Sequence, residues 1–411
     1  MKKVLLWLVM VIVMLAVLLC GAAGAMYAMT GTKNLPDEHP AFGGTTLEPV
    51  GYEWQVPVLG NVVSRIFQQP TTLTVQKLGT MDGAVPTLTL PSWVQRVSVT
   101  LTDPSGVPVV QGDAEALAQY TYTQNGKYEL NLTLYRDETP GKAHGWYKYQ
   151  ANYTMDIRPT AVLSSERVSQ GSVVAVLVTG ILDGSEPVLQ TDLGEVWFRP
   201  VTGGYMGYLP VTYNAEGGAH TLTLTCGSLT QDLTLTVLQK NTDTVDTEPE
   251  EDIPGAGTEY KNAIWPLYTR GSAEKLWQGT FGAPTTAAVK AGYGSRLRTN
   301  GSITGHATGI NYSAAGGTPV TAPQSGTVVY AGTLALTGGT VVIDHGCGVK
   351  SYLFGMDAVT VSKDQSVARD DSLGTASDAH TLIWELRIGS KSVDPDQAVT
   401  GKSGLLYREG M

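Results

Sequence analysis

Histidine and cysteine are the residues of this sequence best suited to bind a transition metal, and the chain of 411 residues contains six histidines and three cysteines. A catalytic zinc ion needs three protein ligands and an open fourth position. Both residue types are spread thinly along the chain, as His39, His144, His220, His306, His345, His380, Cys20, Cys226 and Cys347. None of them are grouped with the short spacing of a zinc site. We therefore expect no metal cluster from these residues and no disulfide within a domain.

The C-terminal part of the chain, from about Leu276 to about Pro395, contains short motifs in a fixed order. They are Leu276-Trp277-Gln278-Gly279, Tyr293-Gly294-Ser295-Arg296, Gly317-Thr318-Pro319-Val320, Ser325-Gly326-Thr327-Val328, Val342-Ile343-Asp344-His345-Gly346, Trp384-Glu385-Leu386-Arg387 and Val393-Asp394-Pro395. In order and spacing this series resembles the LytM or lysostaphin-type zinc endopeptidases, which cut peptide bridges in bacterial cell walls. The resemblance implies an antiparallel β-sheet domain over residues 276–411.

The chemistry of that family needs two motifs, H-x-x-x-D and H-x-H, and one further histidine after the I-D-H-G strand. In the family, the aspartate and two of the histidines bind zinc, and the remaining two histidines assist the reaction. Counted from the motif anchors, the five positions hold other residues in this chain: Ala307, Asn311, Gly355, Thr381 and Ile383. Asn311 offers only a neutral amide, and Ile383 places a branched apolar side chain where a metal would sit. The resemblance therefore implies vestigial positions, with zinc lost and no catalytic or metal-binding residue left.

Two histidines lie one residue away from the family's positions, since His306 precedes Ala307 and His380 precedes Thr381. A slip of one residue along a strand turns a side chain to the opposite face of the sheet. We therefore expect both rings to point away from any metal position. His345 belongs to the I-D-H-G strand, and we expect it to make a structural hydrogen bond.

The sheet scaffold of this domain is retained even though its chemistry is not. Glycines remain at the turn-like positions Gly326, Gly332 and Gly338. The loop before the H-x-H positions is short, because only six residues separate Gly374 from Thr381. We expect a folded domain whose ancestral cleft is now a surface groove.

The upstream sequence alternates between apolar and polar residues with period two, as in strands that bury one face. Tyr128–Leu134 shows this pattern clearly, and Asn125-Gly126 before it is a turn signal. The pattern restarts after Pro159, with Val173–Val178 as a continuous apolar strand. We predict a first β-sandwich with an N-terminal extension over residues 30–158 and a second, immunoglobulin-like one over residues 159–238. The expected fold class is mostly β, with two sandwiches, the LytM-like sheet and one N-terminal transmembrane helix.

An acidic stretch separates the second sandwich from the C-terminal domain. Residues 239–258 contain Asp243, Asp246, Glu248, Glu250, Glu251 and Asp252 and almost no bulky apolar side chain. Such a segment cannot offset its ordering entropy, so we predict a solvated linker within a lead-in over residues 239–275. The formal charge of −10 and the lack of a basic run argue against nucleic-acid binding.

The N-terminus has the pattern of a membrane segment over residues 1–29. Lys2 and Lys3 precede an uncharged apolar run from Val4 to Leu19, and such a run can cross a bilayer as a helix. The lysines place the start in the cytoplasm and the rest of the chain outside. Ala23-Gly24-Ala25 would suit a cleaved signal peptide, which is the alternative to a retained single-pass anchor.

Together these features predict a membrane-anchored, extracytoplasmic protein of the bacterial cell envelope. We expect a non-catalytic LytM-type domain that binds peptidoglycan, an envelope protein, or both. Domains of this type without a metal site activate cell-wall amidases or form part of a sporulation channel. The alternatives are a zinc-dependent peptidoglycan endopeptidase and an inert stalk that presents the sandwiches.

Overall fold

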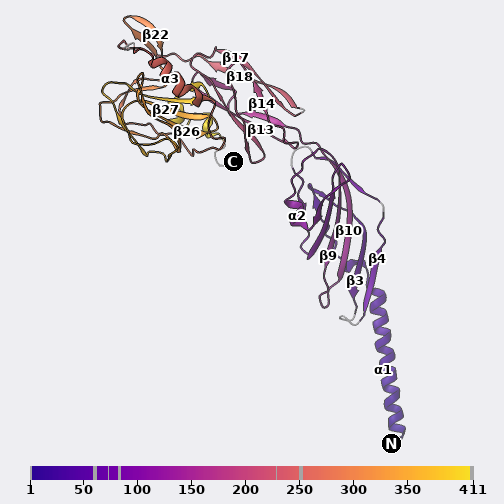
Figure 1. Ribbon diagram of the computed structural model, residues 1–411. Helices are drawn as coiled ribbons and strands as arrows, with labels where there is room; N and C mark the ends of the chain where they lie inside the picture. Colours follow the sequence, from indigo (N-terminus) through magenta and orange to yellow (C-terminus); the bar gives the residue numbers. More distant parts are fainter. Residues whose placement is uncertain are drawn as a thin grey trace. The chain divides into compact units, whose positions relative to one another are not determined.

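A computed structural model describes residues 2–58, 63–72, 74–81, 85–227, 229–249 and 253–407 (Figure 1). The described chain consists mostly of antiparallel strands, with one long N-terminal helix, which confirms the predicted fold class. It forms two compact units. The first unit comprises Met1–Arg158 with Leu182–Gly184, and the second comprises Pro159–Ile181 with Ser185–Met411.

Helix α1 (Lys2–Met29) is long and apolar enough to cross a membrane. A signal sequence near the N-terminus has the same length and composition. Its C-terminal end is held by Arg65 on strand β4 (Ser64–Gln69). The guanidinium donates from Nη1 to the carbonyl oxygens of Tyr27 (3.0 Å), Ala28 (3.2 Å) and Thr30 (2.6 Å). The last carbonyls of a helix lack partners inside the helix, so Arg65 acts as a cap from outside the helix.

The first unit is built around one seven-stranded sheet of order β4-β3-β10-β9-β7-β8, to which β5 adds by pairing with β10. A smaller sheet has the order β2-β1-β6. The bounds are β1 Ala41–Phe42, β2 Thr45–Thr46, β3 Pro49–Pro57, β5 Gln76–Met81, β6 Leu88–Thr89, β7 Arg96–Thr102, β8 Pro108–Gly112, β9 Gly126–Arg136 and β10 His144–Met155, with helices η1 Thr32–Asn34 and α2 Ala114–Ala118. Alternate residues of β9, from Tyr128 to Leu134, are buried in the core, as the period-two pattern predicted.

The second sandwich occupies the start of the second unit. Its two four-stranded sheets have the orders β11-β13-β16-β15 and β12-β18-β17-β14. The bounds are β11 Thr160–Leu163, β12 Arg167–Ser169, β13 Val173–Thr179, β14 Val188–Gln190, β15 Arg199–Val201, β16 Gly204–Pro210, β17 Gly218–Cys226 and β18 Leu229–Leu238.

The C-terminal domain contains a ten-stranded sheet whose main path is β20-β23-β30-β27-β26-β25-β28, with β24, β29 and β31 attached to it. A separate small sheet has the order β19-β21-β22. The bounds are β19 Thr244–Asp246, β20 Ala288–Ala291, β21 Arg296–Thr299, β22 Ser302–His306, β23 Ile310–Ser313, β24 Pro319–Thr321, β25 Gly326–Leu334, β26 Gly338–Gly346, β27 Val349–Val359, β28 Ser366–Val367, β29 Ser372–Ala376, β30 Leu382–Ile388 and β31 Lys391–Val393, with helices α3 Ala256–Ile264, η2 Trp265–Tyr268, α4 Pro395–Val399 and η3 Gly404–Leu406.

The acidic stretch differs from the solvated linker expected over residues 239–258. Thr244–Asp246 forms β19, which pairs in parallel with β21. The guanidinium of Arg298 donates to both carboxylate oxygens of Asp246, at 2.6 and 2.9 Å, so a charge expected to face only water has a bidentate partner. Helix α3 begins at Ala256, inside the predicted linker. Glu250, Glu251 and Asp252 lie outside the described residues.

The second sandwich and the C-terminal domain share one hydrophobic core. Residues of β13 and β16 pack in the same buried cluster as residues of the C-terminal sheet. At the junction the rings of Tyr208 and Trp277 lie 5.5 Å apart, and Trp277 is 1% exposed. Strand β13 is buried on both faces, because Val174, Val176 and Val178 fill the sandwich while the alternate side chains enter the shared core. The two parts therefore form one structural unit.

Replacement of Trp277 by alanine is expected to lower the free energy of unfolding of the second unit by about 3–5 kcal/mol, because it removes a large ring from the shared core. Hydrogen exchange of the full chain in increasing denaturant measures this loss. Strands β13 and β26 should lose protection together. Trp265→Ala, at a side chain 53% exposed, is the matched control and should change stability little. Loss of protection in β26 with β13 unaffected would contradict the shared core.

Candidate functional site

Two of the vestigial positions lie side by side on neighbouring strands of the C-terminal sheet. Asn311 on β23 is directly opposite Ile383 on β30, and Ile383 is opposite Phe354 on β27. Residues directly opposite each other project from the same face of a sheet. The face that carries these three side chains is called the front face below. Strand pairing thus brings together two of the five predicted positions, which are far apart in the sequence.

The other three vestigial positions are held mainly through their backbones. Gly355 lies against Thr381, so close that an added Cβ would be 2.1 Å from the Thr381 carbonyl oxygen. Gly355 also has φ +79°, a conformation that side chains rarely adopt. Thr381 is exposed just before β30 begins, and Ala307 is 2% exposed. A histidine cannot occupy position 355 without a change in the backbone.

The two nearby histidines are engaged elsewhere. The ring of His306 stacks on Tyr213 of the second sandwich, with centroids 4.9 Å apart and planes at 25°. His380 lies in a bend before β30, against Gly338, so the strand alternation does not extend to it.

The side chains at the five predicted positions do not form a zinc ligand set. The five predicted positions hold two aliphatic residues, a glycine, a threonine hydroxyl and an asparagine amide. None of them supplies an imidazole or a carboxylate. Among the described residues, no group of three or more His, Cys, Asp or Glu is arranged to hold a metal ion. Zinc prefers thiolate, imidazole and carboxylate ligands. The donor set therefore gives no basis for a zinc-activated water.

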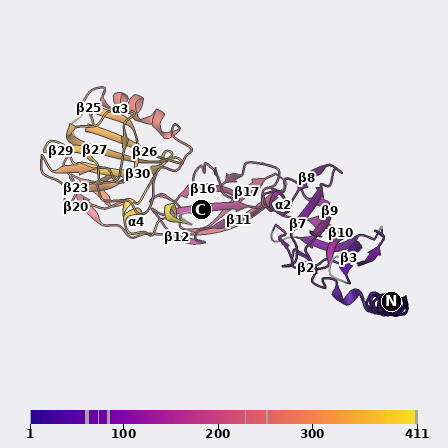
Figure 2. The same ribbon diagram turned by 90° about the horizontal axis from the view of Figure 1, so that it is seen from below.

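Much of the front face is covered by the chain itself. The covering segment, residues 256–276, contains α3 and η2, and Figure 2 shows α3 along the side of the sheet made by β25, β26 and β27. Ile264 is fully buried in one cluster with Tyr352 and Phe354, and Ile383 packs at its edge. The apolar side of the short helix α3 packs against this face of the sheet. A rim around Asn311, Thr381 and Ile383 stays partly or fully exposed.

Aromatic rings link the covering segment to the sheet below it. The ring of Tyr260 lies 6.1 Å from that of Phe354, and the ring of Tyr268 lies 6.0 Å from that of Tyr352. Arg387 places its guanidinium 5.3 Å from the Tyr268 centroid. Such contacts add to the apolar burial of a segment that is otherwise only a short helix and a turn.

Charged groups beneath the covering segment are paired within the domain. Arg387 donates from Nε to the carboxylate of Glu385 at 2.6 Å, and the Thr308 hydroxyl donates to the same carboxylate. Asp344 accepts the backbone N–H of Ser272 at 2.7 Å and lies 3.7 Å from the ammonium of Lys350. Burial lowers the pKa of Lys350, and the carboxylate of Asp344 opposes that effect. These carboxylates therefore act as structural partners.

His345 makes the structural hydrogen bonds expected of it. Its Nδ1 lies 2.8 Å from the carbonyl oxygen of Ser325, and its Nε2 lies 2.8 Å from the hydroxyl oxygen of Ser351. The Ser351 oxygen also accepts the indole N–H of Trp384 at 3.1 Å. The ring is completely buried, and burial lowers the pKa of His345 to about 4. It is a neutral core histidine.

One protein-family profile matches part of the chain. The profile of peptidase family M23 matches residues 305–395, so the chain contains a LytM-type M23 domain. No curated protein matches the sequence. An M23 structure from Pseudomonas aeruginosa is 18% identical, covers 56% of this chain and 94% of its own, and gives a TM-score of 0.43.

Two further solved structures resemble part of this chain. The catalytic domain of lysostaphin from Staphylococcus simulans is 21% identical over 28% of this chain and 92% of its own, with a TM-score of 0.25. A complex of SpoIIIAH and SpoIIQ is 22% identical over 23% of this chain and 71% of that chain, with a TM-score of 0.21.

The covering segment is the part of the site that sequence reasoning missed. Its apolar residues Tyr260, Ile264 and Leu267 recur at spacings of four and three, which is the signature of one helical face. This helical pattern lies directly after the acidic stretch, and residues 239–275 were predicted to be a linker and lead-in. The ion pairs beneath the segment had no comparable signal, since only the pairing of β26, β27 and β30 brings them together.

Substitution of Gly355 by alanine is expected to lower the free energy of unfolding by about 3 kcal/mol or more, because it adds both a clash and an unfavourable φ. Gly301→Ala is the matched control, since Gly301 has φ +83° but nothing within 4 Å of an added Cβ. The control should lose only about 1–2 kcal/mol. Denaturant unfolding measures both. Equal losses in the two variants would show that the contact with Thr381 is loose.

The stability of the second unit is expected to fall as the pH decreases from about 6.5 towards 4, because unfolded His345 binds a proton there and the folded ring does not. Above pH 6.5 the stability is fully present. The expected loss is on the order of 3 kcal/mol. Unfolding measured across this window should be clearly less pH-dependent in His345→Gln than in the unsubstituted protein. The same slope in both would exclude His345 as the origin.

Proposed function

We propose that this protein is a membrane-anchored scaffold of the bacterial cell envelope, exposed on the outer side of the membrane. In this proposal its M23 domain binds peptidoglycan or an envelope protein and does not hydrolyse peptide bonds. The observation that carries the proposal is the composition of the five vestigial positions, which include the glycine at 355 that excludes any side chain.

The front face supports a non-catalytic role. A peptidase needs an accessible cleft in which a substrate carbonyl meets an activated water. Here Tyr352 and Phe354 are buried beneath the covering segment, and Ile383 belongs to the same apolar cluster. The exposed rim around Asn311, Thr381 and Ile383 remains for contacts with a partner.

Helix α1 supports the anchoring part of the proposal. Its apolar window is uncharged after Lys3, and its residues are exposed along almost the whole length, as expected of a helix surrounded by lipid. Arg65 joins the end of this helix to the first unit. Lys2 and Lys3 at the start favour a cytoplasmic N-terminus and an outer position for both units.

A zinc-dependent peptidoglycan endopeptidase is the second candidate, and it is favoured by the family match over residues 305–395. The two candidates differ in metal content and in hydrolysis, so one preparation of the full chain in detergent micelles can separate them.

The purified chain is expected to contain well below one equivalent of zinc by mass spectrometry and to release no peptides from isolated sacculi, because the five positions offer no ligand set. His306→Ala serves as the control for an unforeseen site. Stoichiometric zinc that disappears together with hydrolytic activity in this variant would overturn the proposal.

Binding is tested with the same preparation by co-sedimentation with sacculi and, in a second arm, by cross-linking in isolated envelopes. Thr381→Arg on the exposed rim should reduce retention several-fold if the rim is the contact. Thr304→Arg, at an exposed residue of β22, is the matched control. Absence of binding in both arms would favour an inert stalk.

A further inference from the structure

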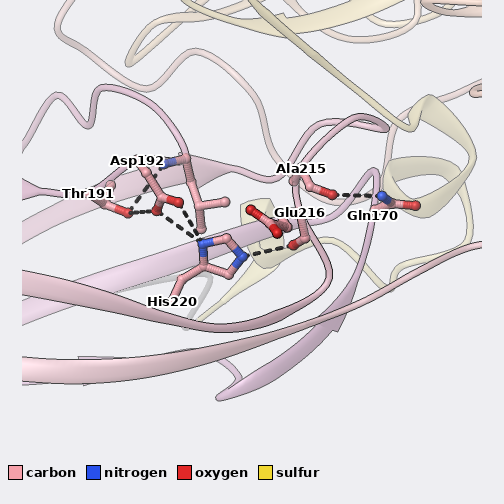
Figure 3. A network of polar contacts seen from close by, with 7 residues as sticks. Gln170, Thr191, Asp192, Ala215, Glu216 and His220 are labelled. Carbon is pink, nitrogen blue, oxygen red and sulfur yellow. Dashed lines mark hydrogen bonds and ion pairs between the residues drawn. The ribbon is translucent and has the colours of Figure 1, made fainter.

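His220 on β17 bridges two loops of the second sandwich through both nitrogens of its ring. Nδ1 lies 3.0 and 2.9 Å from the two carboxylate oxygens of Asp192, and Nε2 lies 2.8 Å from the backbone carbonyl oxygen of Glu216 (Figure 3). Asp192 belongs to the loop of residues 191–198, and Glu216 belongs to the loop of residues 211–217. The ring is therefore a cross-brace between two segments that are not paired as strands.

Both partners of His220 are hydrogen-bond acceptors. A neutral imidazole has one N–H donor, so one of its nitrogens would face an oxygen without a proton between them. The imidazolium has two donors and satisfies both contacts at once. The side chain of His220 is 6% exposed, whereas that of Asp192 is 66% exposed. The geometry thus selects the protonated ring, at a position that solvent reaches through a surface pocket lined by Asp192, Glu216 and His220.

The first of the two loops carries a large contact to the C-terminal domain. Five residues after Asp192, the indole of Trp197 lies against the backbones of two glycines of that domain. A Cβ built on Gly348 would be 2.5 Å from the indole, and one built on Gly389 would be 3.5 Å from it. Trp197 can keep these contacts only while the loop of residues 191–198 keeps its present conformation.

The second loop carries a different contact to the same domain. The backbone N–H of Tyr213 donates to the hydroxyl of Tyr293 at 3.0 Å, and that hydroxyl donates to the carbonyl of Ser392 at 2.7 Å. The ring of Tyr213 also stacks on His306. Gln170 steadies this loop by donating to the carbonyl of Ala215 at 2.7 Å, as Figure 3 shows.

We propose that protonated His220 is a latch that locks these two loops together and so holds the second sandwich against the C-terminal domain. When the ring loses its proton, one of its two contacts is lost. The loops then move independently, and the Trp197 and Tyr213 contacts loosen while the shared core persists. The latch makes the rigidity of the junction depend on pH.

The charged groups that face the ring fix the direction of this dependence. They are the carboxylate of Asp192 on one loop and that of Glu216 on the other. Burial lowers the pKa of His220, but the Glu216 carbonyl and the Asp192 carboxylate outweigh burial, and the net direction is upward from 6.5. The hydrogen bond from His220 correspondingly lowers the pKa of Asp192. The latch is therefore closed below pH 6.5 and opens as the pH rises through the elevated pKa of the folded ring.

Hydrogen exchange of the full chain in detergent micelles, corrected for the intrinsic rate at each pH, tests the latch. Between pH 6.0 and pH 8.5, peptides covering residues 191–198 and 211–217 should lose protection several-fold, while β13 serves as the internal reference. His220→Gln should show the low protection at both pH values. Asp192→Asn, at an exposed side chain that folding tolerates, should shift the opening to lower pH.

His306→Gln is the matched control, because His306 also lies at this junction and touches Tyr213. This variant should keep the full pH response. Equal protection of both loops at the two pH values in the unsubstituted protein would overturn the proposal. A response that is lost in His306→Gln and retained in His220→Gln would overturn it as well.

Discussion

Burial on both faces of strands β13, β26 and β27 is the constraint on which the second unit depends. Every residue of β26 is buried, and so are the first eight residues of β27. One face of the C-terminal sheet packs on the core shared with the second sandwich, and the opposite face lies under the covering segment. Neither cover can be removed without exposing a continuous apolar surface.

This two-sided packing determines which side chains the C-terminal sheet carries on its front face. Ile383 packs at the edge of the apolar cluster that contains Ile264, Tyr352 and Phe354. The carboxylates that remain nearby, Asp344 and Glu385, are held by the covering segment, Thr308, Arg387 and Lys350. Polar groups in this part of the sheet serve the fold, because a buried charge without a partner would be costly.

The sequence predicted the strands better than it predicted what covers them. The alternation in β9 identified its buried face, and the motif order identified the M23 fold. The continuous apolar run of Val173–Val178 was recognised as a strand. Its position between two hydrophobic cores could not be predicted, because it depends on the C-terminal domain that packs against it. For the same reason the cover over the front face was not predicted, since helix α3 packs against strands that lie far along the chain from it. At the site, motif spacing located Asn311 and Ile383, which pair directly. The positive φ of Gly355 was not predictable, because it depends on the backbone geometry of the folded sheet. The contacts of His220 were not predictable either, because folding brings together loops that are separate in the sequence.

Arg65 has a mechanical consequence for the proposed anchor. A helix joined to a domain by a flexible tether can swivel about its own axis without moving that domain. Here one guanidinium holds three carbonyls at the end of α1 while its strand is built into the seven-stranded sheet. Torque on the helix, from lipid packing or from a neighbouring helix, therefore passes into the first unit and is not dissipated at the membrane surface.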